Sequence, residues 1–270
     1  MAGACRADGV EVADRMIVRG GRWFDLDCHR SCCPPEGLEL PATSEVPAVA
    51  EFVGREICPL TDRSALADRL EPSGPMLSRA VSPLADEWLK LRLEATDAGE
   101  DELDECRASE LAVWSRVLCD EYDAEPIQAL PLQDLAMLAV SLTDVDLRDG
   151  LVAWLCPGTL PQELIDPMLF VQMSRALPEP LRFDRDIGDM DQVIGQQRIE
   201  RRLCDLCAAL PDVWAVSPLT VLASFAWWRG DGALTRVALD RALRVDPHYR
   251  LAQLLERMVD LAIRPARASA

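Results

Sequence analysis

Four residues with soft metal-binding side chains lie within six positions near the N-terminus: Cys28, His29, Cys32 and Cys33. Structural zinc takes four such ligands in a tetrahedron, usually from two short pairs. Because Cys32 and Cys33 are adjacent, we do not expect both to bind one ion easily, so a zinc set would combine Cys28, one of these two and ligands from elsewhere. The alternative is a proline-rich loop whose small thiols pack as apolar groups, and we favour this packing interpretation.

A second pair of cysteines, Cys204 and Cys207, has the C-x-x-C spacing that zinc half-sites and thiol redox motifs share. This pair is the distant partner that a zinc site built on the first cluster would need. A redox motif, however, sits at a helix N-terminus, where the helix dipole stabilises the thiolate. The surrounding pattern QQRIERRLCDLCAAL instead predicts the middle of a helix, so we interpret the two cysteines as core residues on one helix face.

The elements that must position these residues begin with a β-hairpin. Two short apolar runs, MIVR (16–19) and RWFDL (22–26), flank Gly20-Gly21, and a Gly-Gly pair supplies the positive φ of a tight turn. Residues 28–43 contain prolines, a glycine and cysteines, which predict an irregular loop. Amphipathic patterns then predict helices at 62–70, 82–96, 101–124, 131–142, 144–156, 192–209, 216–229, 232–245 and 247–263.

These elements predict a mainly α protein, an irregular helical bundle with a small N-terminal β-hairpin and a C-terminal helical hairpin. Prolines 178 and 180 mark a boundary, because proline cannot continue a helix. The expected domains are therefore residues 1–43 (hairpin and Cys/Pro loop), 44–180 (helical bundle) and 181–270 (helical region with a frayed tail).

Three stretches carry a family resemblance: GGRWFDLDCHRSCCPPEGLEL (20–40), DVDLRDGLVAWL (144–155) and residues 222–255. The Gly-Arg-Trp segment, the Cys-Cys-Pro and the later Gly-Asp-Gly turn and Asp-Pro resemble the actinobacterial family called domain of unknown function 4192. Members usually carry an N-terminal α/β portion before Gly-Arg-Trp, whereas about twenty residues precede it here. The resemblance therefore implies either a chain shortened at its N-terminus or a start that lies further upstream. It also implies a fold, a lineage and a cytosolic location but no reaction.

The C-terminal stretch also resembles one tetratricopeptide repeat (TPR). Small residues such as Ala223, Ala226 and Ala242 would let two antiparallel helices approach closely, with residues 230–232 as the turn. We favour core positions over an interface for Trp227 and Trp228, although residues at adjacent helix positions cannot both point fully into the core, and one that is exposed would mark an interface. The predicted binding residues are Trp227, Trp228, Arg236 and Tyr249.

Charge and composition exclude several function classes. The chain carries 28 basic and 46 acidic residues, a net charge of −18, which repels phosphate backbones and argues against nucleic-acid binding. Such a charge favours a basic protein partner, although a local arginine patch could bind an acidic one. The chain has no apolar run long enough to span a membrane and no N-terminal apolar segment typical of a signal peptide. We therefore expect a cytoplasmic protein that binds neither nucleic acid nor membrane.

The function predicted from these patterns is a non-enzymatic protein-interaction or scaffold module. Helical hairpins offer grooves for partners, while the sequence contains no Walker loop, G-x-G-x-x-G, G-x-S-x-G or H-E-x-x-H motif. The alternative is a metal-dependent or thiol-based enzyme that uses the Cys28/Cys32/Cys33 loop, with zinc as the expected ion. No catalytic residues are assigned.

Overall fold

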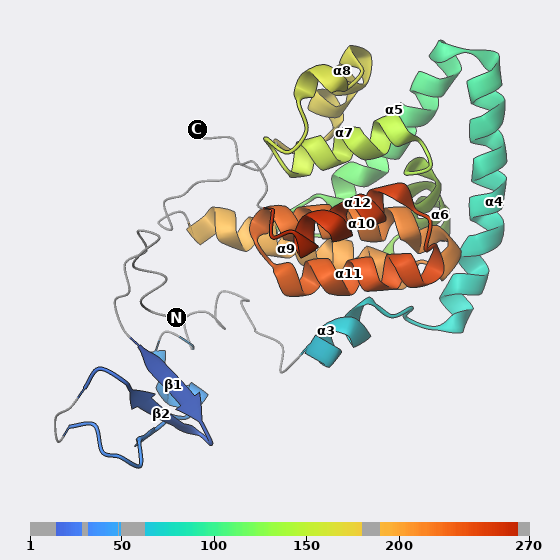
Figure 1. The fold of residues 1–270 in the computed structure, drawn as a ribbon. Helices are drawn as coiled ribbons and strands as arrows, with labels where there is room; N and C mark the ends of the chain where they lie inside the picture. The colour runs from blue at the N-terminus through green and yellow to red at the C-terminus, as the bar shows by residue number, and fades with distance from the viewer. Residues whose placement is uncertain (1–14, 29–31, 48, 50–62, 180–189, 264–270) are drawn as a thin grey trace. The chain divides into compact units, whose positions relative to one another are not determined.

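The computed structural model describes residues 15–28, 32–47, 49, 63–179 and 190–263 (Figure 1). The chain forms two compact units, Met1–Cys58 and Pro59–Ala270, which are described separately below. Helices make up most of the described residues, and the strands are confined to the first unit. This confirms the predicted mainly α fold class.

A three-stranded antiparallel sheet forms the N-terminal unit. Its strands are β1 (Met16–Arg19), β2 (Arg22–Asp25) and β3 (Leu38–Glu39), in the order β1-β2-β3. Gly20 and Gly21 have φ values of 59° and 71°, the positive φ at both central positions that a type I′ turn requires, and the predicted hairpin is confirmed.

Strand β3 lies within the segment predicted to be irregular. It pairs with β2 because the Arg22 guanidinium donates hydrogen bonds to the carbonyl oxygens of Glu36 (2.8 Å) and Gly37 (2.9 Å). The prediction treated the prolines as ending all regular structure, and it overlooked that one arginine side chain can draw the following residues to the sheet edge.

The described residues of the N-terminal sheet do not form a hydrophobic core. Among its residues with described burial, Gly37 alone is buried, while the side chains of Met16, Ile17, Val18, Leu26 and Leu40 are all exposed. A two- or three-stranded sheet needs a buried apolar face or a covalent or metal cross-link to be stable. Hydrophobic burial within the described residues does not supply that stability.

The second unit is a bundle of α-helices with two single 3-10 turns. The helices are α3 (Arg63–Leu70), α4 (Pro75–Ala98), α5 (Glu100–Val117), α6 (Leu132–Ser141), α7 (Val145–Leu155), α8 (Pro167–Ala176), α9 (Met190–Ala209), α10 (Asp212–Arg229), α11 (Gly232–Val245) and α12 (Arg250–Asp260). The turns are Ile127–Ala129 and Gln162–Leu164.

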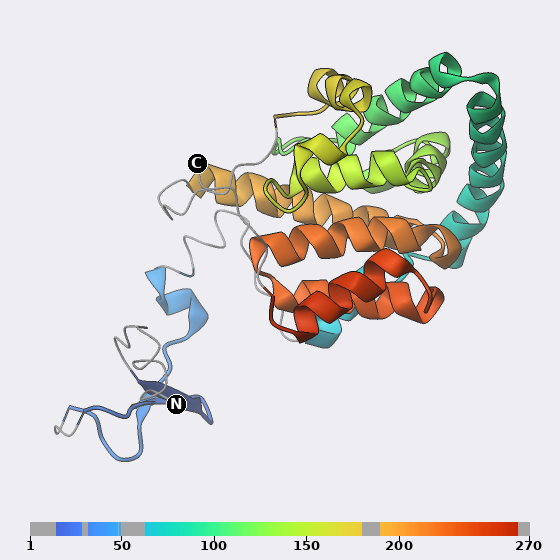
Figure 2. The ribbon, with the colours of Figure 1, turned by 45° about the horizontal axis from the view of Figure 1, so that its top comes forward.

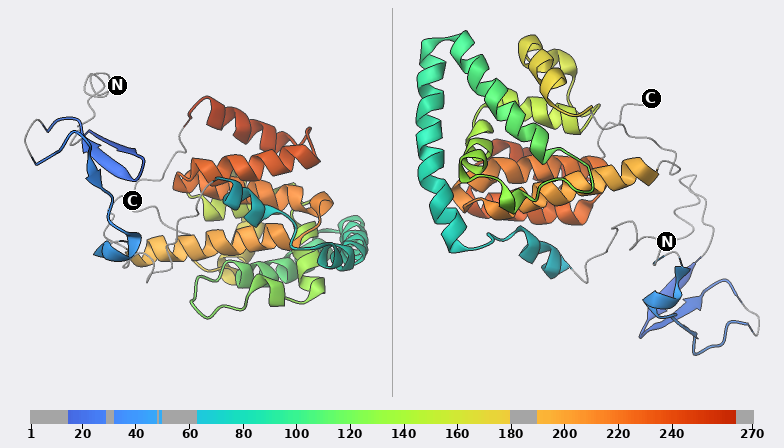
Figure 3. Two further views of the ribbon diagram at one scale, coloured as in Figure 1. Left: turned by 90° about the horizontal axis from the view of Figure 1, so that it is seen from below. Right: turned by 180° about the vertical axis from the view of Figure 1, so that it is seen from behind.

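Helix α10 is the centre of this unit. It packs against α6, α7, α9, α11 and α12, and α9, α10 and α11 lie side by side in Figure 2. Helix α4 runs along one edge, crosswise to α10 and α11 (Figures 1 and 3). Most of the residues of α10 are buried, as expected for a helix that is apolar all round. The largest buried side chains are Trp114, Phe225 and Trp228.

At two helix boundaries, tertiary contacts outweigh the local signals on which the prediction rested. Helix α4 begins at Pro75 rather than residue 82, with Pro83 inside it, because buried Val81 and Ala85 fix the chain as helix on both sides of the proline. Helix α5 ends at Val117 rather than residue 124. The reason is Arg202 from α9, whose guanidinium donates to the carbonyl oxygens of Arg116 (2.7 Å) and Val117 (2.9 Å).

Helix α8 was not predicted, and α10 and α12 differ in length. The Asp166 carboxylate caps α8 by accepting a hydrogen bond from the Leu169 amide at 2.8 Å, with Pro167 in its first turn. This Asp-Pro start signal was present in the sequence and was overlooked. Helix α10 starts at Asp212 rather than residue 216, and α12 covers Arg250–Asp260 rather than 247–263.

Candidate functional site

The Cys28 loop is positioned by polar contacts at both of its ends. At its start the Asp25 carboxylate accepts hydrogen bonds from the backbone amides of Asp27 (2.8 Å) and Cys28 (3.1 Å), the local capping that aspartate makes in turns. At its end the Gly37 amide donates to the Pro34 carbonyl oxygen at 2.9 Å. The loop therefore leaves the sheet and returns to it through hydrogen-bonded turns.

The three thiols of this loop converge. The sulfur atoms of Cys28 and Cys32 lie 3.5 Å apart, and the sulfurs of Cys28, Cys32 and Cys33 all lie within 4.8 Å of one another. The sulfurs of the adjacent Cys32 and Cys33 both lie near that of Cys28, whereas we expected that only one of these two cysteines would be available to an ion. The fourth candidate, His29, lies outside the described residues.

The close contacts among the three thiols disfavour the thiolate form that a nucleophilic cysteine needs. The thiols of Cys28 and Cys32 hydrogen-bond to Cys33, and together with partial desolvation they raise the pKa of Cys33 to about 12. A catalytic cysteine needs its pKa lowered toward neutrality by a nearby cation or helix N-terminus. This environment therefore gives the thiol-based enzyme alternative no support.

Cys204 and Cys207 lie in the last two turns of α9, rather than in the middle of the helix as predicted, and are buried in the helical unit. Burial raises the pKa of both thiols, that of Cys204 to about 12. Both therefore remain protonated near neutral pH and behave as small apolar groups. The pair and the Cys28 loop belong to different units.

Helices α10 and α11 form a tight hairpin. Gly230 adopts the left-handed conformation, with φ 94°, and the amides of Gly230 and Asp231 both donate to the Ala226 carbonyl oxygen, at 3.0 and 2.8 Å. The Asp231 carboxylate then caps α11 by accepting from the Leu234 amide at 2.9 Å. Ala223, Ala226, Ala238 and Ala242 are fully buried, which allows the two helices to approach closely.

The two adjacent tryptophans have different environments. Trp228 is 0% exposed and stacks on Phe225, with ring centroids 6.1 Å apart, and its indole nitrogen donates to the Pro157 carbonyl oxygen at 3.1 Å. It therefore offers no surface to a partner. Trp227 is half-buried and donates to the carbonyl oxygen of Ile263 at 3.1 Å.

The other two predicted binding residues make contacts within the helical unit. Arg236 pairs with Asp260 of α12, with 2.7 Å between nitrogen and oxygen. The Tyr249 hydroxyl lies 2.9 Å from the Ser217 hydroxyl and accepts a hydrogen bond from Arg148 at 3.0 Å. These contacts fix α12 and the turn before it onto α7, α10 and α11.

The outward face of α12 carries exposed leucines among charged side chains, and the sequence pattern of this amphipathic helix did not assign which of its leucines would be exposed. Leu254 is 55% exposed and Leu261 is 66% exposed, while Ala252 and Leu255 face the bundle. A shallow hollow of about 670 Å³ lies over this face, lined by Arg250, Gln253, Leu254, Glu256, Arg257 and Asp260. The adjacent leucines 254 and 255 were the available signal, because neighbours on a helix cannot share one face.

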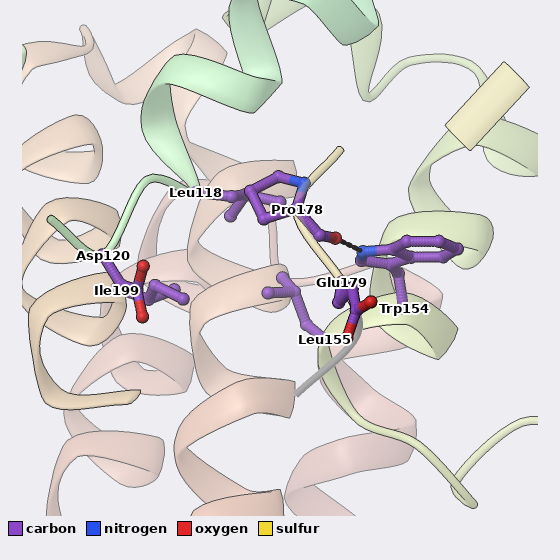
Figure 4. Close-up of a pocket in the computed structure, with 7 residues that line it drawn as sticks. All are labelled: Leu118, Asp120, Trp154, Leu155, Pro178, Glu179 and Ile199. Atoms are coloured by element: carbon purple, nitrogen blue, oxygen red, sulfur yellow. Dashed lines mark hydrogen bonds between the residues drawn. The ribbon is translucent and has the colours of Figure 1, made fainter. Parts of the chain in front are cut away.

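A second hollow, of about 210 Å³, lies where α5, α7 and α9 meet (Figure 4). Apolar side chains, including Leu118 and Ile199, line it together with the carboxylates of Asp120 and Glu179. The Trp154 indole at its wall donates to the Pro178 carbonyl oxygen at 2.9 Å. This volume is below the 300–1,000 Å³ of typical small-molecule sites, and its two carboxylates do not form part of any metal-ligand cluster among the described residues.

Comparison with known proteins identifies the sequence family. The model of the family described as "Domain of unknown function (DUF4192)" matches residues 1–184 and 191–266. Neither a curated protein nor a solved structure matches the chain. Among the described helices, none has the length and apolar character needed to cross a membrane.

Proposed function

Because the chain belongs to the DUF4192 family, whose description gives no activity, we propose a function from its surface: the protein is a non-enzymatic interaction module that binds an acidic amphipathic helix on α12. The observation that carries this proposal is a pair of exposed leucines, Leu254 and Leu261, interleaved with the arginines Arg250 and Arg257.

The spacing of these four residues fits a helical partner. Positions 250, 254 and 257 follow the i, i+4, i+7 pattern that lies along one helix face, and Leu261 follows them as the C-cap residue of α12. A helix laid against this face would bury its own apolar stripe on the two leucines, the helix-in-groove mode of recognition. The hollow of about 670 Å³ along the face provides room for such side chains.

The charges around the hollow indicate the charge of the partner. The chain as a whole carries −18, yet Arg250 and Arg257 are exposed and form no ion pair with any residue that the structure describes. Of the two acidic residues at the hollow, Asp260 is already paired with Arg236, and Glu256 is less exposed than either arginine. Carboxylates flanking the apolar stripe of a partner helix would therefore meet two available guanidinium groups, which bind carboxylates well.

The underlying helices hold this face in place. Ala252 and Leu255 bury the opposite side of α12, which packs on α10 and α11. The Arg236–Asp260 pair and the Tyr249 hydrogen bonds add polar contacts at both ends of the helix. A prearranged surface of this kind loses little entropy when a partner binds.

The proposal is tested with a designed acidic peptide whose leucines repeat at helical spacing between glutamates. Fluorescence anisotropy should give a dissociation constant on the order of 10–100 µM, a weak interface by protein standards. Leu254→Asp should weaken binding at least tenfold, because it places a carboxylate in the apolar contact. Arg257→Glu should also weaken binding, and added salt should reduce affinity.

The matched control is Leu93→Asp, a change at a similarly exposed leucine (57%) on α4, which should leave peptide affinity unchanged. A scrambled peptide of the same composition should not bind measurably. Equal binding by the Leu254→Asp variant, or tighter binding of a basic peptide than of the acidic one, would contradict the proposal. A dimer of the protein that Leu254→Asp abolishes would also contradict it.

A further inference from the structure

Side-chain packing among the described residues gives the N-terminal sheet little stability. Gly37 is the one buried residue among those of the unit with described burial, and five large apolar side chains of the unit are exposed. Small domains without a sufficient core depend on disulfides or on a bound metal. The loop that joins β2 to β3 contains three cysteines, so a cross-linking group is available at the open end of the sheet.

The three sulfurs are close enough to bind a single ion. Zinc–sulfur bonds are about 2.3 Å, so two thiolates on a tetrahedral zinc lie about 3.8 Å apart. The sulfurs of Cys28 and Cys32 are 3.5 Å apart, and no pair among the three exceeds 4.8 Å. Shifts of less than about 1 Å would therefore bring all three sulfurs to coordination distance.

We propose that Cys28, Cys32 and Cys33 bind one zinc ion as three thiolates, and that this ion is the cross-link that stabilises the N-terminal sheet. Three thiolate ligands favour soft or borderline ions over magnesium or calcium. Zinc has no redox chemistry of its own, which suits a structural role. One tetrahedral position remains for a ligand that the described residues do not supply.

Hydrogen bonds hold the described residues on either side of the three cysteines. The Asp25 carboxylate fixes the backbone at Cys28, and the Arg22 guanidinium fixes the carbonyl oxygens of Glu36 and Gly37. The nearby Asp27 carboxylate pairs with Arg15 and so is not needed as a ligand. Because metal binding to a site of this kind is coupled to folding, removal of the ion should unfold the sheet without affecting the separate helical unit.

The first test measures metal in the full chain, purified without a metal-affinity column. Elemental mass spectrometry should find one zinc per chain, and less than a tenth of that in the Cys32→Ser/Cys33→Ser double variant. Cys106→Ser is the matched control, because Cys106 is a partly buried cysteine of α5 in the helical unit, and its zinc content should equal that of the wild type. Cobalt in place of zinc should give a thiolate-to-cobalt charge-transfer band that the double variant lacks.

The second test measures the structural effect. Hydrogen exchange of residues 16–25 should be protected in the zinc-loaded protein and should increase at least tenfold after chelation, while exchange in α10 and α11 stays unchanged. The proposal is overturned if the native protein contains no zinc, if the double variant retains it, or if copper or iron occupies the site instead. A Cys28–Cys32 disulfide in protein prepared under reducing conditions, or unchanged strand protection after chelation, would equally overturn it.

Discussion

Arg241 joins three helix ends, and its replacement is the most direct test of how the helical unit is held together. This α11 side chain is 3% exposed. Its guanidinium donates to the carbonyl oxygen of Leu70, the last residue of α3, and to that of Cys207 at 2.9 Å. It also pairs with the Asp212 carboxylate at 2.9 Å, at the start of α10. The Cys207 carbonyl needs this donor because residue 211, its usual helical partner, is proline.

The expected cost of losing Arg241 follows from the groups left without a partner. Arg241→Met keeps much of the apolar stem but removes every donor, so the carbonyls of Leu70 and Cys207 lose this partner, as does that of Leu210, whose contact is longer at 3.5 Å. Each buried unsatisfied group costs about 1–3 kcal/mol, so the free energy of unfolding should fall by about 3–5 kcal/mol. Arg241→Lys should cost about 2 kcal/mol, because a compact ammonium cannot span the same set of acceptors.

Urea unfolding followed by circular dichroism at 222 nm measures these differences, since helices dominate the signal. The matched control is Arg244→Met, one turn further along α11, where the side chain is 58% exposed and pairs with Glu71. An exposed pair contributes about 0–1 kcal/mol, so this variant should be nearly as stable as the wild type. Equal losses for the Arg241 and Arg244 variants would refute the reasoning, because burial and carbonyl capping would then be irrelevant.

Two further predictions concern a glycine and a carboxylate. Gly37→Ala should destabilise the N-terminal sheet by about 2 kcal/mol or more, since Gly37 has φ 76° and a Cβ there would lie 2.7 Å from the Phe24 ring. Hydrogen exchange of residues 16–25 measures this loss. Gly232→Ala is the neutral control, because a Cβ at Gly232 meets open space. Burial alone would raise the pKa of Asp144, but hydrogen bonding and charge from Arg107 and Arg92 lower it below its ordinary 3.8. The Asp144 charge therefore stabilises the fold above about pH 4, and that stability disappears as pH falls through the lowered pKa. Asp144→Asn keeps an N-cap oxygen, so its deficit in urea unfolding should be full at pH 6 and should shrink toward pH 2; a deficit independent of pH would show that the charge is not its cause.

Local signals predicted the fold well where capping and periodicity agreed. Helix α11 has the predicted bounds, 232–245, because Gly230 and the Asp231 cap define its start within the sequence itself. The bounds failed where a residue distant in sequence decides the outcome. Arg202 lies more than eighty residues from the α5 carbonyls it caps, and no local pattern near residue 117 indicates that the helix stops there.

Local sequence signals also predicted the candidate sites only in part. Residue types alone identified the cysteine loop, but whether Cys32 and Cys33 turn their sulfurs toward one point depends on loop backbone that proline and cysteine spacing do not specify. The amphipathic pattern of α12 was visible, yet the sequence could not show that the bundle covers Leu255 and leaves Leu254 exposed. Which side of a helix is covered depends on how many neighbours surround it, and that is a property of the packed unit.

The use of arginine in the helical unit bears on the proposed α12 surface. Arg92, Arg202 and Arg241 are buried and act within the protein, each donating to carboxylates or backbone carbonyls of other elements. An arginine is costly to bury and is well suited to joining several acceptors, so these positions serve the fold. Arg250 and Arg257 differ because they are exposed and flank an exposed leucine. Arg257 lies in the last turn of α12, where a cation stabilises the helix dipole, whereas Arg250 is the first residue of the helix, where a cation does not. Binding of an acidic helix would therefore explain the cation at Arg250, which the stability of α12 does not.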